Sequence, residues 1–112
     1  MEPSIDPPVN CLRHIVGFRY KPEATTDDIN QLTDAFRALK DQIEGIMSFE
    51  YGVNNSPEGM DVGLSNIHTL TFVDVDARDA YLTHPAHLAF GELLNELDIV
   101  TDVVVIDYVV QT

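Results

Sequence analysis

The sequence has 112 residues, 45% of them hydrophobic and 22% charged, which is the length and composition of one small globular domain. Only 6 Lys and Arg stand against 19 Asp and Glu, and the net charge of −13 argues against nucleic acid or an anionic membrane as partner, since both attract a positive surface. Because Cys11 is the only cysteine, we expect a reducing compartment, the cytoplasm, and no apolar run approaches the roughly 20 residues of a membrane-spanning helix.

Residues 1–11 contain three prolines and are expected to form an extended arm, with the domain itself at residues 12–112. Residues 11–20 are rich in β-branched and aromatic types and predict a first strand. A helix is predicted next, because Thr26 can cap a first turn and apolar residues then recur every three or four positions, at Ile29, Leu32, Phe36, Leu39 and Ile43. Gly45 is expected to end this helix.

Two further strands are predicted at residues 46–53 and 66–74, separated by a polar loop of turn-forming residues. Asp76 can cap a second helix, which Pro85 interrupts because proline removes a helical hydrogen bond. Since proline suits the first turn of a helix, a new helical segment is expected from Pro85 to about Leu97.

The last predicted strand, residues 102–110, is apolar on both faces. The order βαββαβ indicates an α+β fold, the ferredoxin-like arrangement, in which the helices cover only one face of the sheet. A sheet with one wet face should alternate apolar and polar residues, yet this strand carries Val104, Ile106, Tyr108 and Val110 on the face opposite Val103, Val105 and Val109. We therefore expect the second face to be covered by another copy of the chain, in a homodimer.

Alternation along the strands puts several candidate site residues on one face of the sheet: His14, Val16, Phe18, His68, Leu70, Val103, Val105 and Asp107. With the first and third strands taken as parallel neighbours, and the last strand antiparallel to the first, His14, His68 and Asp107 are expected to meet at one end of the sheet. His87 would face them from the second helical segment. Phe36, Tyr81 and Phe90 complete the expected apolar pocket.

A neutral imidazole in an apolar pocket can accept a proton from a carbon acid or a phenol near neutral pH. His87 is the candidate base, with Asp107 or His14 as the group that orients it. The alternative is structural: His84 and His87 could bond backbone groups at the helix break, His14 could be a core histidine bonded to Asp107, and His68 fits either role. The histidines lack the spacing of a metal-binding helix pair, so we expect no metal and no cofactor.

Four segments resemble the stress-responsive A/B barrel (Dabb) domain family: HIVGFRYKPEAT, SFEYG with its following SPEG, HPAHLAF, and VIDY. The resemblance covers roughly residues 12–110 and implies a dimeric α/β barrel built from two ferredoxin-like protomers. It also implies that His14, Val16 and Phe18 line a cavity and that His87 matches the catalytic histidine of a cyclase in the family. Phe36 replaces a tyrosine of that cyclase, and Asn66 replaces a histidine common at the start of the family's third strand, so the same cyclisation is not expected.

Two functions follow as expectations. The first is a cofactor-free cyclase or lyase that uses histidine acid–base catalysis on an aromatic or polyketide-like substrate. The second is a non-catalytic stress-associated protein, in which the histidines are structural and the pocket binds a small apolar ligand or nothing. The fold family does not decide between them, because one fold supports many functions.

Overall fold

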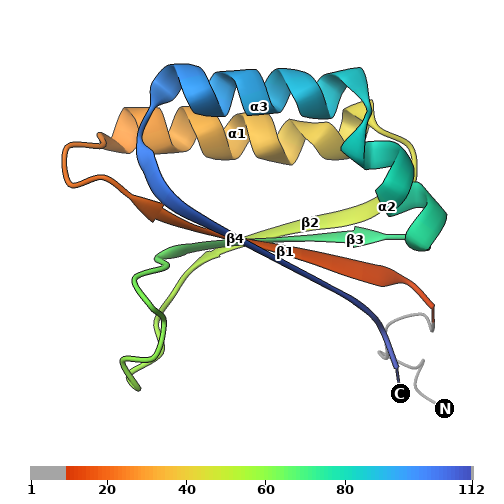
Figure 1. Ribbon diagram of the computed structural model, residues 1–112, viewed down its shortest axis with the longest axis horizontal. Helices are drawn as coiled ribbons and strands as arrows, with labels where there is room; N and C mark the ends of the chain where they lie inside the picture. Colours follow the sequence, from red (N-terminus) through yellow and green to blue (C-terminus); the bar gives the residue numbers. More distant parts are fainter. Residues whose placement is uncertain (1–9, 112) are drawn as a thin grey trace, which may run out of the picture.

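The computed structural model describes residues 10–111, which form a four-stranded antiparallel sheet with helices on one face (Figure 1). In chain order the elements are β1 (Leu12–Tyr20), α1 (Thr26–Gln42), β2 (Ile46–Val53), β3 (Asn66–Phe72), α2 (Val75–Leu82), α3 (Pro85–Leu97) and β4 (Val100–Val109). The strand order is β2-β3-β1-β4, which confirms the predicted ferredoxin-like fold. Of the arm expected at residues 1–11, residues 1–9 lie outside the described range.

All three strand pairs are antiparallel, so the expectation that β1 and β3 run parallel was wrong. The helix between β1 and β2 returns the chain so that these two strands run the same way, and β3 lies between them in the opposite direction. In the resulting register His14 lies opposite Leu70, and Val16 lies opposite His68. His68 is therefore displaced along the sheet from His14 instead of meeting it at one end.

The ends of α1 are set by residues close to those predicted. Thr25, not Thr26, caps the helix, because its side chain accepts a hydrogen bond from the backbone N–H of Asp28 at 3.1 Å. Gly45 follows the helix with φ +91°, in the region that favours glycine. A Cβ at this position would lie 2.7 Å from the Cβ of Ala77, so the close approach of α2 also requires glycine.

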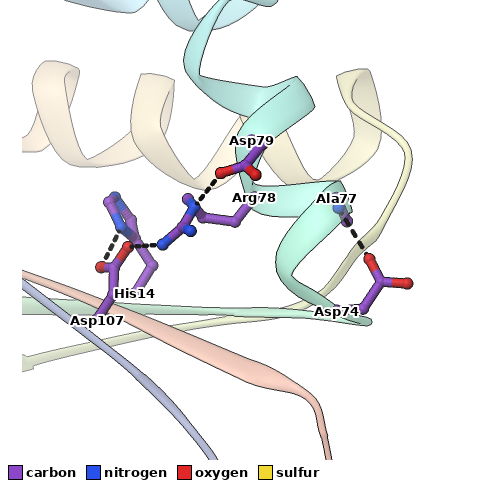
Figure 2. Close-up of polar contacts among 6 residues, drawn as sticks. All are labelled: His14, Asp74, Ala77, Arg78, Asp79 and Asp107. Atoms are coloured by element: carbon purple, nitrogen blue, oxygen red, sulfur yellow. Dashed lines mark hydrogen bonds and ion pairs between the residues drawn. The ribbon is translucent and has the colours of Figure 1, made fainter.

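The break between α2 and α3 falls where Pro85 predicted it. Asp74, not Asp76, caps α2 through a 2.8 Å bond from a backbone N–H of the first turn (Figure 2). His84 caps α3, because its Nδ1 accepts the backbone N–H of Ala86 at 3.0 Å. The helical segment predicted from Pro85 to about Leu97 is confirmed.

The core fills the space between the helices and the sheet. The apolar stripe of α1 faces the strands, as its spacing predicted, and the largest fully buried apolar side chains are Phe18, Leu32, Phe36, Leu39, Leu70, Phe72 and Tyr81. Figure 1 shows α1 and α3 side by side over the sheet, with α2 at one end. The space enclosed by these helices and the strands below is where the predicted site must lie.

The opposite face of the sheet carries no helix (Figure 1). We call this surface the open face and define it by Ile15, Val104, Ile106 and Tyr108 at the β1–β4 side and by Ile67 and Thr69 of β3. Val104, Ile106 and Tyr108 are all exposed in the single chain. Exposed apolar groups gathered on one surface are typical of an interface between protein chains.

Candidate functional site

A cavity of about 220 Å³ lies between the sheet and the helices. Its walls are mostly apolar, and its polar groups are two imidazoles and one phenol. The lining residues are His14, Val16, Phe18, Phe36, Tyr81, Leu82, His87, Phe90, Gly91, Leu94, Val103 and Val105. An apolar cavity with a few polar groups is the usual form of a small-molecule site.

The strand residues of this cavity come from β1 and β4. For that reason the predicted pocket residue Leu70, which lies on β3, does not line it, and its side chain is buried in the core. The other predicted pocket residues all line the cavity: Val16, Phe18, Phe36, Tyr81, Phe90, Val103 and Val105. Leu82, Gly91 and Leu94 were missed, although Gly91 and Leu94 follow His87 by one and two helical turns and so share its face of α3.

His14 and Asp107 form a bonded pair at one side of the cavity. They are direct cross-strand neighbours in β1 and β4, and His14 Nδ1 lies 2.7 Å from Asp107 Oδ1 (Figure 2). An ionised carboxylate can only accept hydrogen bonds, so Nδ1 carries the proton and donates it to Asp107. In the neutral ring Nε2 is then the atom with a free lone pair.

Arg78 of α2 binds the second oxygen of the same carboxylate. Its Nη1 donates to Asp107 Oδ2 at 2.8 Å, and its Nε donates to Asp79 Oδ1 at 2.8 Å (Figure 2). The bonds to Asp107 and Asp79 raise the pKa of Arg78 further above its ordinary value, so the guanidinium stays charged. Arg78 was not predicted as a site residue from the sequence; its position one turn before Tyr81 was the available signal.

His87 lies in the first turn of α3, and its Nδ1 donates to the carbonyl of Leu82 at 3.2 Å. Burial lowers the pKa of His87, against the opposing effect of this bond, so the neutral ring with a free Nε2 predominates at neutral pH. Because the Nδ1 atom of His87 bonds the carbonyl of Leu82, Asp107 orients the ring of His14 and not that of His87. The ring of Tyr81 lies close to both imidazoles, with centroid distances of 5.5 Å to His14 and 4.2 Å to His87.

Tyr81 contributes a phenol that stays protonated. Burial raises its pKa, and the negative charge of Asp107 adds to this effect. The hydroxyl can therefore donate a hydrogen bond but does not act as a base near neutral pH.

His68 does not line the cavity. It is fully buried among four aromatic rings, those of Phe18, Phe36, Phe49 and Tyr51. Its Nδ1 donates to the carbonyl of Val16 at 2.9 Å, and within the described part of the chain its Nε2 has no hydrogen-bond partner. Burial lowers the pKa of His68, with the backbone bond opposing.

We expect His68 to make the fold sensitive to acid. Its pKa in the folded state lies below the unfolded value of about 6.5, so the unfolded chain takes up the proton first as the pH falls. The contribution of neutral His68 to the free energy of unfolding is therefore complete above about pH 6.5. It decreases below that pH until the pH reaches the pKa of His68 in the folded state. Replacing His68 by Phe, which is similar in size, should remove most of this decrease in urea unfolding curves recorded from pH 7 to about pH 5.

A smaller decrease should remain in the His68→Phe variant, because the pKa of His87 is lowered in the same direction. An equal decrease in the wild type and in His68→Phe would show that His68 is not the group responsible.

Within residues 10–111 we find no group of three His, Cys, Asp or Glu side chains placed to hold a metal ion. No helix of this range is long and apolar enough to cross a membrane. Cys11 is buried next to β1, where its carbonyl accepts the backbone N–H of Val110 at 2.9 Å.

The sequence is similar to those of a known protein family and of several known proteins. The model of the family described as Stress responsive A/B Barrel Domain matches residues 12–110. Stress-response A/B barrel domain-containing protein HS1 of Arabidopsis thaliana is 31% identical over 98 residues, which are 87% of this chain and 87% of that protein. Olivetolic acid cyclase of Cannabis sativa is 23% identical over 83 residues, 74% of this chain and 82% of the cyclase.

Two solved structures show the same fold. The hydroxynitrile lyase of Passiflora edulis gives a TM-score of 0.82 at 23% identity, over 93% of this chain and 96% of the lyase. A ferredoxin-like protein of Jannaschia sp. CCS1, described as dimeric, gives a TM-score of 0.75 at 26% identity, over 89% of this chain and 99% of its own.

Proposed function

Because the chain belongs to the stress-responsive A/B barrel domain family, we propose from its cavity that it is a cofactor-free enzyme of the lyase or cyclase type. The proposed substrate is a compact aromatic molecule with an acidic O–H or C–H group. One relative is named a cyclase and one structural neighbour a lyase, and both names agree with this class of chemistry. The observation that carries the proposal is that two imidazoles with free Nε2 atoms, His14 and His87, line one apolar cavity.

The volume of the cavity limits the substrate. A closed apolar cavity of about 150 Å³ is enough for a benzene molecule, whereas pockets for larger ligands reach about 300–1,000 Å³. At about 220 Å³ this cavity suits one aromatic ring with a small substituent. The rings of Phe36 and Phe90, with centroids 4.5 Å apart, supply an apolar surface for such a ring. A single aromatic ring is therefore the substrate group that we expect the cavity to hold.

The proposed reaction needs proton transfers that the histidines of the cavity can supply. His87 Nε2 accepts the proton of the substrate O–H or C–H, and the resulting imidazolium later returns it to the leaving group or the product. In a lyase reaction the electrons of the O–H bond form the new carbonyl, and those of the broken C–C bond leave with the departing group, which takes the proton. His14 Nε2 can accept the same proton in place of His87, and Asp107 then stabilises the positive charge on the His14 ring until the proton is returned.

We further propose that two chains pair through the open face. Several structural neighbours are described as dimeric ferredoxin-like proteins, and the exposed apolar side chains of β4 need a cover. An interface on this side of the sheet leaves the helix-side cavity accessible in each protomer. The cytoplasm remains the expected compartment, since the single cysteine needs no oxidising environment.

A second function is supported by the hydrogen bonds of the histidines themselves. His84 and His87 both bond backbone groups around the helix break, and His14 bonds Asp107. These contacts are also what a non-catalytic stress-associated protein would need for stability. In that function the cavity holds a ligand without turnover, or no ligand at all.

Ligand binding in the cavity can be measured by thermal unfolding. We expect a single-ring phenol or aldehyde at 100 times its Kd to raise the free energy of unfolding by about 2.7 kcal/mol and the Tm by several degrees. In the Gly91→Leu variant the new side chain occupies the cavity, so this shift should be lost. Asn95→Leu, on an exposed position of the same helix, is the control and should keep it. If no single-ring compound shifts the wild-type Tm, the enzyme proposal fails and the structural function is favoured.

A further inference from the structure

We infer that Arg78 is a positioning residue of this site: by binding Asp107, it holds His14 in the one tautomer whose Nε2 can accept a proton. The role of that tautomer in catalysis rests on the proposed function. The contacts that fix it do not, because they are present in the described structure whatever the protein binds.

The three side chains form a continuous chain of hydrogen bonds from α2 to the sheet (Figure 2). Asp107 uses Oδ1 for His14 and Oδ2 for Arg78, at 2.7 Å and 2.8 Å, so both of its oxygens are held. Arg78 is itself held at a second point by Asp79. Because the guanidinium is planar and bound at two of its nitrogens, it leaves the carboxylate little freedom to rotate away from His14.

The Arg78–Asp107 pair is also better shielded from solvent than the other ion pairs of residues 10–111 between arginine or lysine and carboxylates. Its two side chains are 21% and 22% exposed, whereas in each of the others at least one partner is 47% exposed or more. A partly buried pair is screened less by salt and water than a surface pair. The pair can therefore act on the site more strongly than a surface ion pair could.

Arg78 also balances the charge beside His14. The guanidinium on the second oxygen offsets part of the negative charge of the carboxylate that binds the ring. The titratable groups around His14 are Asp107 from β4, Arg78 and Tyr81 from α2, and His87 from α3.

The same contact fixes the helix that carries Tyr81. Arg78 and Tyr81 lie three residues apart on α2 and so face the same side, toward the sheet. Anchoring Arg78 to β4 therefore holds the Tyr81 ring against His14, with the centroids 5.5 Å apart. Both the proton position on His14 and the shape of the cavity wall depend on this one arginine.

The test is the ¹⁵N spectrum of the His14 ring in labelled protein at neutral pH, assigned by its loss in His14→Gln. The two neutral tautomers and the imidazolium give different patterns. We expect the wild type to show the Nδ1-protonated tautomer and Arg78→Met to show a larger share of the Nε2-protonated tautomer. Arg78→Lys keeps the charge and should lie in between.

The control is Arg37→Met, because Arg37 forms a 2.7 Å pair with Asp34 on the surface of α1, and neither residue is a hydrogen-bond partner of His14 or Asp107 in the described structure. It should leave the His14 spectrum unchanged. A wild-type pattern for His14 in folded Arg78→Met would overturn the inference.

The activity readout separates this inference from the proposed function. With a substrate in hand, Arg78→Met should lower kcat by at least about tenfold with little change in KM, since Arg78 does not line the cavity. If the wild type shows no turnover, the proposed function fails, while the His14 spectrum still decides whether Arg78 positions the ring.

Discussion

Replacing Ile106 by Asp is expected to convert the proposed homodimer into a monomer. Ile106 lies in the middle of β4 on the open face, between Val104 and Tyr108, and is 58% exposed in the single chain. A buried carboxylate without a partner costs several kcal/mol, and a two-fold interface contains the substitution twice. The dimer Kd should rise by at least about 100-fold, which sedimentation or light scattering measured across a concentration series would detect.

Leu88→Asp provides the matched control. Leu88 is a similarly exposed aliphatic residue, 55% exposed, but it lies on α3, on the other side of the sheet. This variant should remain a dimer with the Kd of the wild type. A dimer that survives Ile106→Asp, or that is lost in Leu88→Asp instead, would place the interface somewhere other than the open face.

Replacing Phe36 by Ala is expected to cause a large loss in the free energy of unfolding. Phe36 is buried at the centre of the aromatic core, with ring centroids 4.5 Å from Phe90, 4.9 Å from His68 and 5.5 Å from Phe49. Removing a buried phenylalanine costs about 3–5 kcal/mol, a large part of the roughly 5–15 kcal/mol that stabilises a small domain. The free energy of unfolding measured in urea should fall by this amount.

A surface substitution distinguishes this core effect from a general sensitivity of the fold. Leu88→Ala removes a similar apolar side chain from an exposed helical site and should change the free energy of unfolding by less than about 0.5 kcal/mol. A loss below about 1 kcal/mol in Phe36→Ala would mean that the ring does not hold the core together as described.

Much of the fold could be predicted because periodic spacing and proline report local structure directly. The recurrence of apolar residues from Ile29 to Leu39 predicted α1, and Pro85 predicted the start of α3. The strand bounds differ from the predicted ones by no more than two residues at any end, for predictions of 11–20, 46–53, 66–74 and 102–110. The helix caps could not be predicted to the residue, because Thr25 and Thr26 are adjacent and chemically equivalent, and Asp74 lies two residues before Asp76.

The direction of β3 relative to β1 could not be read from the alternation of side chains. Alternation reports which face a residue lies on, but it is the same for a parallel and an antiparallel neighbour. The ferredoxin-like order decides the direction, and it makes every neighbouring pair antiparallel. Because of this error His68 was expected to meet His14, whereas the structure places Leu70 opposite His14 and His68 opposite Val16.

The site residues on neighbouring strands were predicted, whereas Arg78, which α2 contributes, was not. His14 and Asp107 were expected on one face at one end of the sheet, and the structure joins them by a hydrogen bond. Arg78 contacts Asp107 across 29 residues of sequence, from a different element, and no local pattern reports such a contact. Contacts of this kind depend on how α2 packs on the sheet, which the sequence pattern did not specify.

Hydrogen exchange in a single-ring carbon acid tests the proposed acid–base chemistry most directly. Phenylacetone in D₂O has acidic C–H groups next to its carbonyl, and NMR follows their replacement by deuterium. The wild type is expected to accelerate this exchange by at least about 100-fold over the His14→Gln, His87→Gln double variant. Equal rates for the two proteins would contradict a catalytic role of these histidines and leave a binding or structural function.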